Sequence, residues 1–279
     1  MFSEIMADPK CNWRRVQSEM RGIENHSSPN FGPRRGGAVP DLVVLHYTGM
    51  DTAEAAIARM ADPASEVSAH YLVDLDGRVV RMVGEEMRAW HAGSASWGGV
   101  ADVNSRSIGI EIVNPGRELG YPPFPEPQIA ALEALLADIF ARHAIAPERV
   151  VGHACVAPSR KCDPGEKFDW RRLARRGLSV WLDPEPAALG LAESGVAEAA
   201  RFQSAARRFG YGAPDSGEWC EPTRAVWRAF LMRFLPFEAD ASPHRAGIGH
   251  LERLAARWPC VAPGATGARP GLDPLHPTP

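Results

Sequence analysis

The stretch VGHACVAPSRKCDPG, residues 151–165, gathers side-chain types that hold zinc in proteins. It contains His153, Cys155, Lys161, Cys162 and Asp163. A catalytic zinc ion keeps three protein ligands and leaves its fourth position for water, and its ligands are usually drawn from several strands and loops. His46 closes an earlier apolar run, DLVVLHYT, so it and His153 are candidates for two ligands from two strand ends.

The segment KCDPG offers the third ligand. In extended backbone, neighbouring side chains point to opposite sides, whereas residues two apart share a side. If Asp163 faces the metal, Lys161 faces it as well and Cys162 points away. A cation beside a metal is useful for stabilising an oxyanion that forms on a substrate. The spacing therefore favours Asp163 as the third ligand.

A second ligand set stays open at this point. By the same period of two, Cys155 shares the side of His153, so a set of His46, His153 and Cys155 is an alternative. Other zinc motifs are excluded, because the sequence has neither an HExxH motif nor a CxxC pair.

Strand and helix patterns alternate over residues 41–180, which predicts an α/β domain with a mixed central β-sheet flanked by helices. One helix, with Asp51 as its N-cap, and a hairpin around Asp76–Gly77 lie between the first strand and the strand that carries Glu111. The segments are the strands DLVVLHYT, SIGIEIVN and ERVVGHAC, the hairpin SAHYLVDLDGRVVRMV, and the helices DTAEAAIARMAD and EPQIAALEALLADIFARHAI.

The remainder of the chain divides into four parts. Residues 1–40 form an N-terminal arm, expected to be irregular over 24–40, and residues 181–195 form a linker. Residues 196–258 predict a small all-α domain with two amphipathic helices, and residues 259–279 a disordered tail. Aromatic residues at helical spacing in the all-α domain are expected to form its core: Phe202, Phe209, Trp227, Phe230 and Phe234.

Composition limits the classes of partner. The 279 residues carry a net charge of −3, with a pI of about 6.3, so no basic field favours nucleic acid. No apolar run is long enough to insert into a membrane, and no obligate protein partner is evident. The start of the sequence lacks a signal-peptide core, and the five cysteines are scattered. We expect a cytoplasmic protein, or a periplasmic one if the true N-terminus carries an unseen signal.

Seven short segments in order resemble one family, the zinc-dependent N-acetylmuramoyl-L-alanine amidases of the type-2 amidase and peptidoglycan-recognition superfamily. The resemblance runs from SPNFGPRR to about residue 180, roughly half of the chain. The segments are LHYTGM, VSAHYLVDLDG, RAWHAGSASWGG, NSRSIGIEIVNPG, FPEPQIAAL, VGHACVAPSRKCDPG and FDWRRLA. Residues 196–258 look like a divergent peptidoglycan-binding module of the kind that follows such amidases.

The resemblance implies roles for individual residues. The family's zinc ligands fall on His46, His153 and Asp163. Its catalytic glutamate falls on Glu111 and its catalytic lysine on Lys161. Glu111 would take a proton from the attacking water and pass it to the leaving amine, while zinc and Lys161 would share the charge of the oxyanion. Flanking Ile110 and Ile112 are expected to face the core, so that Glu111 opens onto the other side of the sheet.

Three further residues and two departures concern the surroundings of this site. Trp90 and His91 resemble the family's substrate groove, and Asn104 resembles a polar residue that supports the substrate site. Relatives commonly carry an acidic residue where this chain has Cys155, and some carry a tyrosine where it has Ala69.

The function implied is hydrolysis of the amide bond between N-acetylmuramic acid and L-alanine in muropeptides, including 1,6-anhydro forms. One alternative is a non-catalytic muropeptide-binding protein, as found in the same superfamily. Recognition proteins typically lose the third ligand, whereas Asp163, Lys161 and Glu111 are all present here. Another alternative is a closed structural zinc or redox site that uses Cys155 and Cys162.

Overall fold

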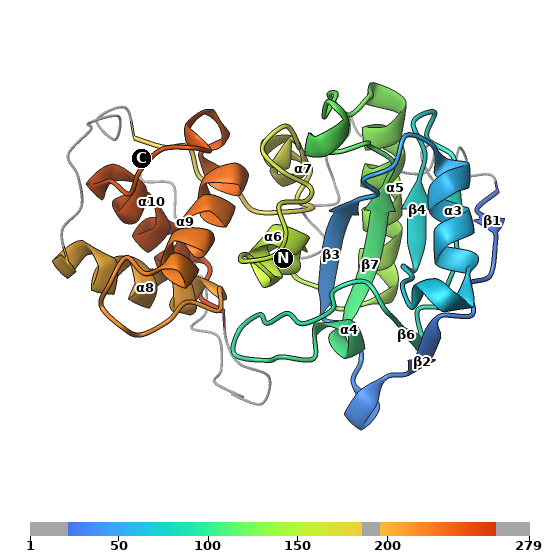
Figure 1. The fold of residues 1–279 in the computed structure, drawn as a ribbon, viewed down its shortest axis with the longest axis horizontal. Helices are drawn as coiled ribbons and strands as arrows, with labels where there is room; N and C mark the ends of the chain where they lie inside the picture. The colour runs from blue at the N-terminus through green and yellow to red at the C-terminus, as the bar shows by residue number, and fades with distance from the viewer. Residues whose placement is uncertain (1–21, 186–195, 261–279) are drawn as a thin grey trace, which may run out of the picture.

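The structure, a computed structural model, describes residues 22–185 and 196–260. Its centre is a six-stranded sheet with the order β1-β5-β4-β7-β3-β8 (Figure 1). Strand β3 runs parallel to β7 and β8, and β4 runs parallel to β7 but antiparallel to β5. The predicted mixed sheet is confirmed. Its strands are β1 (Glu24–Asn25), β3 (Leu42–Tyr47), β4 (Tyr71–Val73), β5 (Val79–Arg81), β7 (Ser107–Ile112) and β8 (Val150–Gly152).

The N-terminal arm is less irregular than its composition predicts. Residues 24–25 form β1, which pairs with β5, and β2 (Phe31–Pro33) pairs antiparallel with β6 (Met87–Ala89). The edges of β5 and β6 that face the arm provide backbone hydrogen-bond partners, which the local sequence of the arm does not reveal. Residues 1–21 of the predicted arm lie outside the described residues.

The period of two along the strands separates the two faces of the sheet. On β7, Ile108, Ile110 and Ile112 pack with Val43 and Leu45 of β3 against helix α5 (Glu126–Arg142). The intervening side chains of both strands therefore emerge on the opposite face. That face is covered in part by helix α3 (Ala53–Ala61) and in part, at Leu42 and Val44, by the C-terminal helices. It also carries the candidate site.

The local helix signals are mostly confirmed, with one correction. The N-cap of α3 is Thr52 and not Asp51, because Thr52 has the extended backbone and its side-chain oxygen accepts a hydrogen bond from the Ala55 amide at 3.2 Å. The remaining α-helices within residues 22–185 are short. They are α4 (Val103–Arg106), α6 (His153–Val156) and α7 (Trp170–Arg175).

The C-terminal region is helical, as predicted, and contains a helix that its pattern did not single out. Figure 1 shows α8 (Val196–Phe209), α9 (Glu221–Phe234) and α10 (Arg245–Arg257) together, at the end of the molecule opposite α3. The five aromatic residues expected in its core are all buried. They belong to one hydrophobic cluster that also includes Leu42, Val44 and Val151 of the sheet. Residues 186–195 of the predicted linker and 261–279 of the predicted tail lie outside the described residues.

A buried arginine ties the helical region to the sheet. Arg233 of α9 is 1% exposed, and its guanidinium donates to the Val150 carbonyl of β8 at 2.9 Å. The same group lies 4.6 Å from the Trp170 ring centroid and 4.8 Å from that of Phe234. Cation–π contacts of this kind are strongest where water is excluded. Among the residues described, no helix is both long and apolar enough to span a membrane.

We expect Arg233→Ala to lower the free energy of unfolding by about 2–4 kcal/mol, because it opens a cavity and leaves the Val150 carbonyl without its partner. Arg228→Ala on the same helix is the matched control. Arg228 is half-exposed and paired with Glu221, so its loss is expected to cost at most about 0.5 kcal/mol. Urea denaturation of both variants measures the difference. Equal midpoints would contradict the anchoring role of Arg233.

Candidate active site

Two functional side chains lie next to each other because of strand register. His46 of β3 pairs with Glu111 of β7 in a parallel ladder. Partners in such a ladder project to the same side of the sheet. The flanking Ile110 and Ile112 are buried against α5, so Glu111 opens onto the opposite face, as the sequence predicts.

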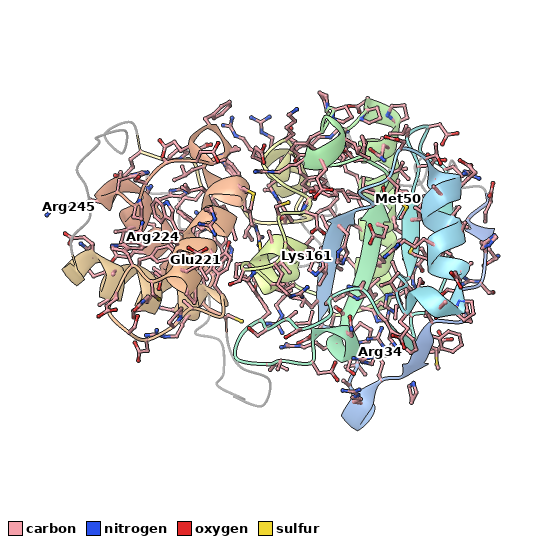
Figure 2. The ribbon with its side chains drawn as sticks, in the orientation of Figure 1. Arg34, Met50, Lys161, Glu221, Arg224 and Arg245 are labelled. Atoms are coloured by element: carbon pink, nitrogen blue, oxygen red, sulfur yellow. The ribbon has the colours of Figure 1, made fainter. Side chains whose placement is uncertain are left out.

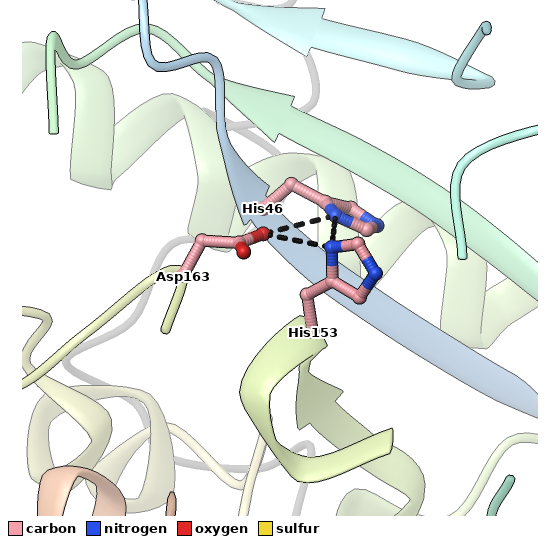
Figure 3. A group of neighbouring side chains, drawn as sticks. All are labelled: His46, His153 and Asp163. Carbon is pink, nitrogen blue, oxygen red and sulfur yellow. Dashed lines mark hydrogen bonds and ion pairs between the residues drawn. The ribbon is translucent and has the colours of Figure 1, made fainter. Parts of the chain in front are cut away.

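Two more side chains reach His46 from the chain beyond β8. His153 is the first residue of α6, directly after that strand, and Asp163 follows in the next loop. The Nδ1 atoms of His46 and His153 are 2.9 Å apart, and each lies 3.1 Å from Oδ2 of Asp163 (Figure 3). All three side chains are buried. The structure thus brings together the three residues predicted as metal ligands.

The three donor atoms suit a zinc ion. Bonds of 2.0–2.1 Å at tetrahedral angles place neighbouring ligand atoms about 3.3 Å apart, close to the separations seen here. Burial and the neighbouring His153 lower the pKa of His46 to about 4, so its ring is neutral at pH 7. Burial opposes ionisation of Asp163, but the two histidines hold the pKa of this carboxyl well below its usual range. A neutral imidazole and an ionised carboxylate are the forms that bind metal.

Cys155 does not belong to this group, which rules out the alternative ligand set among the described residues. The argument from a period of two was wrong for this residue, because the strand ends at Gly152 and His153 begins a helical turn. Successive helical residues rotate by about 100°, so residues two apart diverge. The Cys155 thiol is 3.8 Å from both the Tyr211 hydroxyl and the Arg233 guanidinium, on the side of the C-terminal helices.

Glu111 has the surroundings of a proton-transfer group. Its Oε2 atom is buried and has no hydrogen-bond partner among the described residues. Burial first, and then the charge of Asp163, raise the pKa of Glu111 well above its usual value, while Lys161 acts in the opposite direction. An unpartnered buried carboxylate is costly to a fold and typical of an active site.

The three metal-ligand candidates and Glu111 open into a cleft with a volume of about 750 Å³. His46, Glu111, His153, Asp163 and Lys161 all line it. Lys161 is exposed, and Figure 2 shows it in the middle of the molecule. Cys162 also lines the cleft, but its thiol contacts the Tyr47 hydroxyl at 3.0 Å instead of joining the three metal-ligand candidates.

The residues predicted to bind substrate separate into two groups. Trp90 and His91 line the cleft. Asn104 is 5% exposed and lies behind it, where its side-chain oxygen accepts hydrogen bonds from the His91 amide at 3.2 Å and the Ala92 amide at 2.8 Å. Asn104 thus holds the backbone of the groove segment, which agrees with a supporting role, and it is not among the residues that line the cleft.

Sequence reasoning missed part of the cleft wall and one half-buried cation. The cleft is also lined by Met50, Arg59, Met60, Val67, Arg117 and Arg160, which carry no distinctive local pattern. Arg34, labelled in Figure 2, donates to the carbonyls of Glu85, Ser105 and Ser107 and so fixes the start of β7. Its only signal in the sequence is its place in SPNFGPRR, the segment where the family resemblance begins.

Comparisons with known proteins agree with this geometry. Residues 36–166 match the family model described as N-acetylmuramoyl-L-alanine amidase. The N-acetylmuramoyl-L-alanine amidase AmiD of Escherichia coli is 36% identical over 232 residues, covering 76% of this chain and 82% of AmiD. The 1,6-anhydro-N-acetylmuramyl-L-alanine amidase AmpD of Escherichia coli is 32% identical, covering 56% of this chain and 93% of AmpD.

Solved structures give the same assignment. AmiD of Escherichia coli, in complex with the substrate anhydro-N-acetylmuramic acid-L-Ala-D-γ-Glu-L-Lys, superposes with a TM-score of 0.69 at 31% identity, covering 82% of this chain and 98% of AmiD. AmpDh3 of Pseudomonas aeruginosa, in complex with an anhydromuramic pentapeptide, gives 0.67 at 30% identity, with coverages of 84% and 96%. The cleft, the three converging ligands and these matches lead to one conclusion: the chain belongs to the N-acetylmuramoyl-L-alanine amidase family.

Proposed function

We propose that this protein hydrolyses the amide bond between the lactyl group of N-acetylmuramic acid and L-alanine in soluble muropeptides, including 1,6-anhydro forms. The observation that carries the proposal is the free, buried carboxylate oxygen of Glu111, in register with His46 at the wall of the cleft. Bound anhydro-muramyl peptides in the solved AmiD and AmpDh3 complexes support the choice of substrate.

Zinc is the proposed metal, held by His46, His153 and Asp163. When bound, it supplies a positive charge that polarises the amide carbonyl and makes water acidic enough to attack near neutral pH. The neutral ring of His46 and the ionised carboxylate of Asp163 are already in the forms that this role requires.

The chain's own residues then account for the proton and the charge. Glu111 takes a proton from water at its carboxylate as the oxygen bonds to the amide carbon. Lys161, at the wall of the same cleft, stabilises the negative charge that develops on the carbonyl oxygen. Glu111 returns its proton to the alanine nitrogen as the C–N bond breaks. The products are the muramic carboxylate and a peptide with a free amino terminus.

Trp90 lines the same cleft and is proposed to contact the substrate. A cytoplasmic location stays a prediction from the sequence. The peptidoglycan-binding role of residues 196–258 is likewise a prediction from the sequence. The aromatic residues of α8 and α9 are buried in a core, where they cannot serve as a binding surface.

The test is peptide release, followed by mass spectrometry, from purified zinc-loaded protein. The substrates are 1,6-anhydro-N-acetylmuramyl tripeptide and intact sacculi, and Glu111→Ala is the control. We expect release from the soluble muropeptide by the wild type and none by the variant. Release from sacculi alone would overturn the substrate preference. Binding of the muropeptide without release from either substrate would overturn catalysis in favour of the recognition role.

A further inference from the structure

Both histidines of the metal site present Nδ1 to the site, and both use Nε2 for a hydrogen bond on the far side of the ring. Nε2 of His153 lies 3.1 Å from the carbonyl oxygen of Ala92. Nε2 of His46 lies 3.0 Å from Nδ1 of His91. A neutral imidazole carries one proton, so the outer hydrogen bond decides whether Nδ1 has the lone pair that a metal needs.

For His153 two acceptors compete for the ring proton. The Ala92 carbonyl and the ionised Asp163 Oδ2, 3.1 Å from Nδ1, can both only accept. When a metal binds Asp163, the ring proton of His153 is on Nε2 and is donated to Ala92. Its Nδ1 is then left with a lone pair. The partner of His46 is another imidazole, which can donate or accept, so this contact alone leaves the tautomer of His46 undecided.

The direction of the hydrogen bond between His46 and His91 is set by the next partner of His91, the Ser107 hydroxyl. Nε2 of His91 lies 3.1 Å from the Ser107 hydroxyl, and that hydroxyl donates to the Val103 carbonyl at 2.7 Å. Because the carbonyl can only accept, it takes the single hydroxyl proton, and Ser107 must accept from His91 Nε2–H. Nδ1 of His91 is then an acceptor, and His46 donates to it through Nε2–H. The lone pair of His46 Nδ1 is thereby aimed at the metal site.

Packing holds this row of hydrogen bonds in place. The His91 ring lies against β7 at Gly109, where an added Cβ would come within 2.4 Å of the ring. The backbone of His91 and Ala92 is held by the Asn104 side-chain oxygen. One buried asparagine thus positions the acceptors of both histidine ligands.

We propose that His91, biased by Ser107, is a positioning residue that holds His46 in the tautomer whose Nδ1 binds the metal. The proposal rests on the proposed function, since it concerns the same metal site. It assigns His91 to the support of a ligand, where the sequence indicated a contact with substrate. Outer hydrogen-bond partners of metal-ligating histidines commonly contribute 10- to 100-fold to metal affinity.

The test is zinc affinity, measured by competition with a chelator in the absence of substrate. His91→Phe keeps a ring but removes the acceptor, and we expect zinc to bind about 10- to 100-fold more weakly. His91→Asn places an amide oxygen near the position of Nδ1, so it is expected to recover most of the affinity. Trp90→Phe, at the neighbouring cleft residue, is the matched control and is expected to bind zinc as the wild type does.

Ser107→Ala removes the hydroxyl that accepts from His91 Nε2–H and leaves the His91 ring in place. We expect a smaller loss of affinity than in His91→Phe, and no additional loss when the two changes are combined. In zinc-loaded protein, 1H–15N NMR is expected to show a slowly exchanging Nε2–H of His46 in the wild type and a faster-exchanging one in Ser107→Ala. A purely structural role would lower the melting temperature equally with and without zinc, whereas a positioning role lowers the zinc-induced gain.

Wild-type zinc affinity in a folded His91→Phe variant would overturn the proposal, as would a rapidly exchanging Nε2–H of His46 in the zinc-loaded wild type. Failure of the proposed function is a different result. In that case the wild type itself would bind no zinc or release no peptide, whatever the behaviour of His91.

Discussion

Glu111→Gln is expected to lower turnover of the anhydro-muropeptide by about 10²- to 10⁴-fold, the usual contribution of a general acid–base group. The amide keeps the shape of the side chain but can neither take the proton of water nor return it to the alanine nitrogen. Zinc content is expected to stay at the wild-type level, because Glu111 is outside the group of three converging ligands. Mass spectrometry of released peptide, together with zinc analysis, measures both quantities.

The free energy of unfolding distinguishes the loss of the acid–base group in Glu111→Gln from misfolding of the variant. The pKa of Glu111 is raised in the folded protein, so its contribution to stability is present below the unfolded pKa and is lost as pH rises through the folded pKa. Metal-free Glu111→Gln is therefore expected to be more stable than the wild type at pH 7, with the difference shrinking toward pH 4. Turnover near the wild-type rate would show that another group moves the proton.

Asp163→Ala is expected to remove zinc from the protein and turnover with it. Oδ2 of Asp163 lies 3.1 Å from both histidine nitrogens and completes the set of three donors. Since outer-sphere partners already contribute 10- to 100-fold to metal affinity, the loss of a direct ligand is expected to weaken zinc binding by more than about 100-fold. Chelator competition and peptide release measure the two effects.

Cys155→Ala is the control for this ligand assignment. Its thiol contacts Tyr211 and Arg233 and lies outside the metal group, so zinc affinity is expected to match the wild type. The reverse pattern, with zinc lost in Cys155→Ala and kept in Asp163→Ala, would show that the third ligand is wrong. It would also revive the structural-zinc alternative raised by the sequence.

Local periodicity determined the positions of the catalytic strands. The apolar run that ends at His46 and the alternation around Glu111 predict two strands whose polar side chains share one face, and the register of β3 with β7 bears this out. Side chains two apart in a strand must point the same way, so this information is contained in a few neighbouring residues. The order of motifs, from LHYTGM to FDWRRLA, likewise placed the chain in its family before any fold was known.

The tertiary structure alone decided what lies around those strands. The backbone changes from strand to helix between Gly152 and His153, which turns Cys155 toward the C-terminal helices. The partners of His91 and Arg233 come from elements distant in sequence. Hydrogen-bond direction and burial depend on the groups that arrive from those distant elements, and no local pattern encodes them. The sequence therefore predicted which residues are proposed to do the chemistry, and the fold determined which groups surround them.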